Sequence, residues 1–77
     1  MSQGVVLFHT TTSALRAEKI LQKDGLTVKL IPTPRELSSD CGIALRFDWD
    51  DRERVAAGLA SAGVEHQKMS KMPEILA

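Results

Sequence analysis

The sequence predicts an α+β fold of the ferredoxin-like, split βαβ type, with a four-stranded antiparallel sheet and two helices on one face. Two helix-like segments, each with a strand-like segment before and after it, give the element order β-α-β-β-α-β. A length of 77 residues suits a single domain, residues 1–77. Right-handed crossovers would place the first and third strands in the middle of the sheet.

The first half of the chain supplies a strand, a helix and a second strand. Residues 5–8 are continuously apolar, which indicates a central strand buried on both faces. Residues 10–13 are all Thr or Ser and offer N-caps for a helix with apolar residues at helical spacing. Gly25 is expected to close this helix. Residues 26–30 then alternate between apolar and polar, as in a half-exposed strand.

The second half repeats this plan. Residues 43–49 alternate, with Leu45, Phe47 and Trp49 expected to face the core. Asp50 and Glu53 have the spacing of a capping box and predict the start of the second helix.

The second helix and the final strand complete the expected fold. An apolar stripe runs from Val55 to Ala62, and Gly63 is expected to end the helix. Residues 64–69 predict a short polar edge strand, and residues 70–77 a C-terminal tail. The ordered core is therefore expected to span residues 4–69.

Composition argues against several classes of function. Ten basic residues balance ten acidic ones, whereas proteins that bind nucleic acid or anionic membranes usually have a basic excess. One cysteine excludes an internal disulfide, and with two histidines the chain is poorly equipped for a zinc site. No cofactor motif is present. The sequence shows no secretory signal and no apolar run of about 20 residues, so a reducing cytoplasm is the expected location.

The connection between the second and third strands, residues 32–42, is longer than a hairpin needs. Thr33, Pro34 and Glu36 fit an N-cap, a first-turn proline and the closing residue of a capping box. We therefore expect one ordered helical turn in this connection.

Cys41 ends this connection and is the candidate for covalent chemistry. In the expected topology it lies at the sheet edge where the first helix begins, near Thr10, Thr11 and Thr12. Helix N-terminal N–H groups stabilise anions, and the thiolate is the reactive form of cysteine. Arg35 would add positive charge, while Asp40 would oppose it. A thiol pKa below about 8.5, the unperturbed value, is the resulting hypothesis.

Each of these residues also has a simpler interpretation. Cys41 could be a buried small hydrophobe. The run 10–12 could only cap the helix rather than bind an anion. His9 could be a base or hydrogen-bond partner for the thiol, or a half-buried histidine bonded to backbone. Gly42 could keep the sulfur accessible, or supply a backbone conformation closed to other residues.

Three stretches resemble the selenium/sulfur (Se/S) carrier protein-like family of small bacterial proteins. They are Ala-Leu-Arg-Ala-Glu-Lys at 14–19, Pro-Thr-Pro-Arg-Glu at 32–36 and Ser-Ser-Asp-Cys-Gly-Ile-Ala at 38–44. The resemblance covers residues 5–69. It implies that Cys41 holds sulfur or selenium as a persulfide or selenosulfide. It also implies donor and acceptor proteins as partners, such as a cysteine desulfurase or an enzyme of selenium metabolism.

The sequence therefore leaves two alternative functions open. In the first, Cys41 is the chalcogen acceptor of a carrier, more a relay component than a stand-alone enzyme. In the second, the chain is a non-catalytic binding, regulatory or protein-interaction module in which Cys41 is structural. A homodimer formed through edge strands is compatible with either function.

Overall fold

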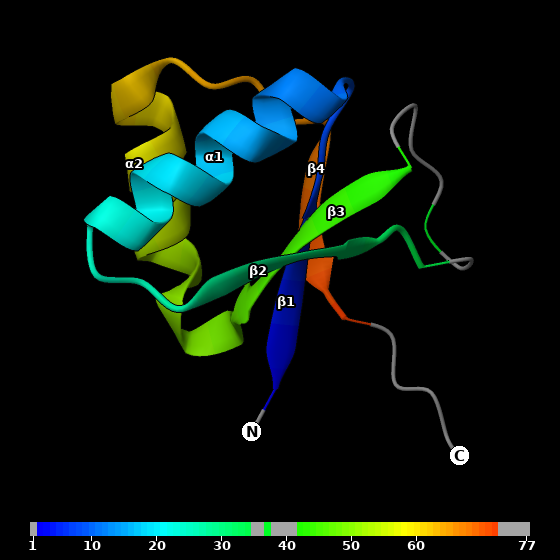
Figure 1. Ribbon diagram of the computed structural model, residues 1–77. Helices are drawn as coiled ribbons and strands as arrows, with labels where there is room; N and C mark the ends of the chain where they lie inside the picture. The colour runs from blue at the N-terminus through cyan, green and yellow to red at the C-terminus, as the bar shows by residue number, and fades with distance from the viewer. Residues whose placement is uncertain (1, 35–36, 38–41, 73–77) are drawn as a thin grey trace.

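The computed structural model describes residues 2–34, 37 and 42–72 (Figure 1). Cys41 and Arg35 lie outside the described residues. The elements are β1 (Gln3–Leu7), α1 (Thr11–Lys23), β2 (Val28–Pro32), β3 (Ile43–Asp48), a 3-10 turn η1 (Trp49–Asp51), α2 (Arg52–Ala62) and β4 (Lys68–Lys71).

The strands form one antiparallel sheet in the order β2-β3-β1-β4. The first and third strands are therefore central, as the ferredoxin-like topology requires. Both helices lie on the same side of the sheet (Figure 1). The expected fold class is confirmed.

The larger core lies between the sheet and the helices. It joins sheet residues such as Val6, Leu45 and Phe47 to Leu21 of α1 and Leu59 of α2. All five are at most 3% exposed. The period of two in the strands and the helical spacing in α1 and α2 thus turn their apolar residues toward one shared interior.

A second apolar cluster lies on the other face of the sheet, which we call the helix-free face. Val5, Leu7 and Ala44 form it and are 0%, 1% and 0% exposed. Ile31, Leu37 and Met72 pack against them. The central strand β1 is therefore buried on both faces, as its continuous apolar run predicts.

The boundaries of two strands differ from the expected ones. The second strand is Val28–Pro32 instead of 26–30. The last strand is Lys68–Lys71 instead of 64–69, so Ser70 and Lys71, expected in the tail, are part of the sheet. This strand pairs with residues 4–7 of β1, and Gln67 N–H and Met72 N–H donate to Leu7 O and Gln3 O at its ends. The bounds of β4 are thus set by the residues of β1 with which it pairs. The polar sequence of β4 does not indicate these bounds.

The start of the second helix also differs. Asp48, and not Asp50, is the capping residue. Its Oδ1 accepts a hydrogen bond from Asp50 N–H at 3.1 Å, and it is the N-cap of η1. Asp51 precedes α2 without a side-chain cap. Trp49 consequently leaves the strand, and its ring stacks on Phe47 with centroids 6.0 Å apart. The predicted capping box at Asp50 and Glu53 is wrong.

Candidate functional site

Three strand ends meet at one edge of the sheet. Ala44, near the start of β3, pairs with Leu7 at the end of β1 and with Ile31 near the end of β2. Beyond the ladder, Thr33 N–H donates to Gly42 O at 3.0 Å. The residue that follows Cys41 is therefore held at the edge where β1 leads into α1, as the topology predicts.

Gly42 is exposed, and its φ is not positive. A Cβ added at this position would meet no atom of the described residues within 4 Å beyond its chain neighbours. The interpretation that Gly42 supplies a backbone conformation closed to other residues is therefore wrong. Among the described residues, this glycine has open space around its own position.

Thr10 is the N-cap of α1. Its Oγ1 accepts from Ser13 N–H at 3.2 Å, and the same hydroxyl donates to Ser13 Oγ at 3.1 Å. Ala14 N–H donates to Thr10 O. Two N–H groups of the first turn are thus already engaged, so the capping interpretation holds for Thr10. Thr11 and Thr12 are exposed in the first turn, where the positive end of the helix dipole acts.

His9 lies between β1 and the N-cap and is exposed, not half-buried. It leaves the sheet at the same edge as Gly42. The site residues Cys41 and Arg35 are outside the described part of the chain, so their contacts with His9 and with the first turn of α1 stay predictions.

Leu37 is a residue that the sequence analysis did not single out. Its N–H donates to Pro34 O at 3.0 Å, which closes a turn where a helical turn is expected. Its side chain packs on the helix-free face with Val5 and Leu7. The connection is therefore anchored at Leu37 on the face opposite α1, four residues before Cys41. The only sequence signal for this anchor is a single apolar residue within a polar connection.

The described residues contain no group of three or more His, Cys, Asp or Glu side chains placed to hold a metal ion. None of the described helices is long and apolar enough to cross a membrane.

Comparison with known proteins identifies a family. Residues 3–71 match the family described as "Putative Se/S carrier protein-like". The "Uncharacterized protein MJ0011" of Methanocaldococcus jannaschii is 30% identical over 66 residues, which are 86% of this chain and 33% of that protein. The "Uncharacterized protein YtiA" of Escherichia coli K12 is 33% identical over 45 residues, 58% of this chain and 53% of that protein. The chain thus spans at most about half the length of these relatives. No solved structure matches it.

Proposed function

The chain belongs to the Se/S carrier protein-like family, and from this premise we propose that it carries sulfur or selenium on Cys41 between partner proteins. The match over residues 3–71, which includes Cys41, is the observation that carries the proposal.

The chemistry needs a single thiol. The Cys41 thiolate attacks the outer sulfur of a persulfide on the donor, an S–S bond forms at Cys41, and the donor thiolate leaves. A nucleophile on the acceptor then attacks the same outer sulfur, and the Cys41 thiolate leaves. Each step is an exchange with no net oxidation, so no resolving cysteine is required. The selenium reaction follows the same course.

The surroundings of Gly42 support this role. A donor persulfide has to approach the attacking sulfur along the S–S axis, which requires free space beside Cys41. Gly42 supports such space, because a Cβ at this position would meet no described atom within 4 Å beyond its chain neighbours. The first turn of α1 at the same edge would favour the thiolate over the thiol.

The test is loading by a donor. We expect that incubation with a cysteine desulfurase and cysteine adds about 32 Da to the intact mass, and that dithiothreitol removes this addition. Cys41→Ser should gain nothing, because the accepting sulfur is gone. The proposal fails if the wild type gains no mass, or if Cys41→Ser gains as much.

A matched variant tests the role of access. Gly42→Val should load more slowly, because its branched Cβ stands beside the sulfur, while its urea midpoint should remain near the wild-type value. The Cys41 thiol of the native wild type can also be tested for reaction with a chromogenic disulfide. If it reacts neither with this reagent nor with the desulfurase, the result favours the alternative function, a protein-interaction module in which Cys41 is structural.

A further inference from the structure

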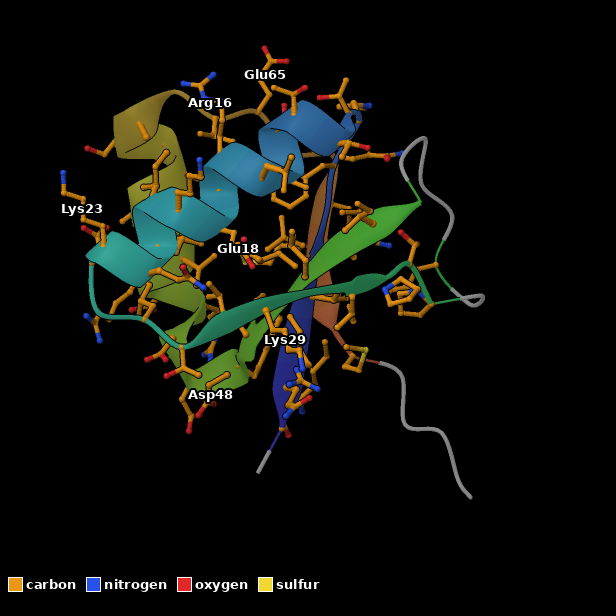
Figure 2. The ribbon with its side chains drawn as sticks, in the orientation of Figure 1. Arg16, Glu18, Lys23, Lys29, Asp48 and Glu65 are labelled. Atoms are coloured by element: carbon orange, nitrogen blue, oxygen red, sulfur yellow. The ribbon has the colours of Figure 1, made fainter. Side chains whose placement is uncertain are left out.

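Two cations face each other on the helix-free face. Lys29 of β2 and Arg46 of β3 are paired in register. Residues opposite each other in an antiparallel pair have Cβ atoms about 4.5–5.5 Å apart, and like charges in these positions destabilise the sheet. Figure 2 shows Lys29 on the side of β2 away from α1.

Neither cation has a carboxylate partner among the described residues. Asp48 is the nearest candidate in sequence, and its Oδ1 accepts from Asp50 N–H at the start of η1. Arg46 is moreover half-buried, since its strand is the central neighbour of β1 and β2. The pair thus places two positive charges side by side on an edge strand and its neighbour, in a chain of net charge zero.

The two cations line a hollow of ≈ 560 Å³. This volume lies within the range of about 300–1,000 Å³ that is usual for small-molecule sites. Polar side chains of Ser2, Gln3 and Thr27 also line it, together with Asp48. Two cations against one carboxylate leave the hollow with a net positive charge.

We propose that this hollow binds a small organic oxyanion, whose carboxylate or phosphate group lies between Lys29 and Arg46. Two converging cations can each donate charge-assisted hydrogen bonds to the oxygens of one such group, and Arg can do so in bidentate fashion. The bound anion would remove the like-charge repulsion that the free protein bears. The volume leaves room for an organic body beside the anionic group.

The hollow is separate from the sheet edge at Gly42. It lies at the Phe47–Asp48 end of β3, whereas Gly42 precedes the opposite end. A strand rises about 3.3 Å per residue, so the two ends of β3 are roughly 17 Å apart. The proposal therefore does not depend on the carrier function.

Amide chemical shifts of the 15N-labelled protein, followed at low ionic strength, test the proposal. Inorganic phosphate and succinate are added in separate titrations, so that the two arms distinguish a phosphate from a carboxylate ligand. At least one should give saturable shifts below about 10 mM, centred on residues 27–29 and 46–48. Arg46→Ala should weaken this binding at least tenfold. Lys23→Ala, which removes an exposed cation on α1, should leave it unchanged.

The free protein provides a second measurement. Lys29→Ala should raise the urea midpoint in buffer without phosphate or succinate, because it removes the repulsion, and added anion should stabilise the wild type more than this variant. The proposal is overturned if neither anion gives saturable shifts, or if the shifts are as large along α1. Arg46→Ala binding as tightly as the wild type would overturn it as well.

Discussion

At the scale of single residues, two glycines near the ends of neighbouring strands have opposite surroundings. Gly4 is buried in β1, directly across from Phe47. A Cβ at Gly4 would come within 2.6 Å of Trp49 Cε3 and 2.8 Å of Phe47 Cε2. At Gly42 a Cβ would meet none of the described atoms within 4 Å beyond its chain neighbours. Gly4 therefore allows close ring packing, whereas no described side chain packs against the position of Gly42.

This contrast predicts the effect of adding one methyl group at each site. Gly4→Ala should lower the free energy of unfolding by about 1–3 kcal/mol, the usual cost of overpacking, because two stacked rings must move. Gly42→Ala is the matched control and should change it by less than about 1 kcal/mol, with the unfolded-state entropy favouring the alanine. Urea denaturation measures both. Equal effects at the two sites would contradict the ring contacts.

The cap of α1 makes a second prediction at this scale. Thr10→Ala should cost about 1 kcal/mol, because Ser13 N–H loses the side-chain acceptor that the hydroxyl provides. Thr12→Ala, in the same turn and exposed, should be neutral or slightly stabilising, since alanine is the better helix former. Thermal denaturation should place the midpoint of the Thr10 variant about 4–8 °C lower. A loss of the same size at Thr12 would argue against Thr10 as the cap.

At the scale of elements, the local sequence pattern was sufficient to predict those elements whose form depends mainly on their own residues. The apolar run of β1, the threonine cap of α1 and the glycine at the end of α2 are all found as expected, and Gly63 adopts a left-handed φ of 68°. The element order followed from the same patterns, and with it the ferredoxin-like topology.

Elements whose limits depend on a neighbour could not be placed from sequence. The residues of β4 are polar and lack a strong period, so their register is set by the free edge of β1. The start of α2 shows a different difficulty. Asp48, Asp50 and Asp51 are all possible caps, and the choice depends on where Trp49 can stack. The meeting of strand ends at the candidate site was predictable from topology, whereas the Leu37 anchor was not.

At the scale of the whole molecule, the central strand β1 is buried on both sides, although both helices lie on one side of the sheet. Leu7 on the helix-free face is 1% exposed, close to the 0% of Leu45 on the helix side. Ile31, Leu37 and Met72 pack against the cluster that contains Leu7. Leu37 lies in the connection between β2 and β3 and Met72 directly follows β4, so these two side chains from outside the sheet add a thin apolar layer over this cluster.

This layer predicts that the two faces are equally sensitive to truncation. Leu7→Ala and Leu45→Ala should each cost about 2–5 kcal/mol, because each leaves a cavity in buried surroundings. If the helix-free face were open to water, Leu7→Ala would cost far less than Leu45→Ala, since a side chain already in contact with solvent loses little on removal. Urea denaturation of both variants decides between these outcomes. Leu37→Ala, combined with Leu7→Ala, should then cost less than the sum of the two single changes, because the two side chains belong to one apolar cluster and their losses are shared.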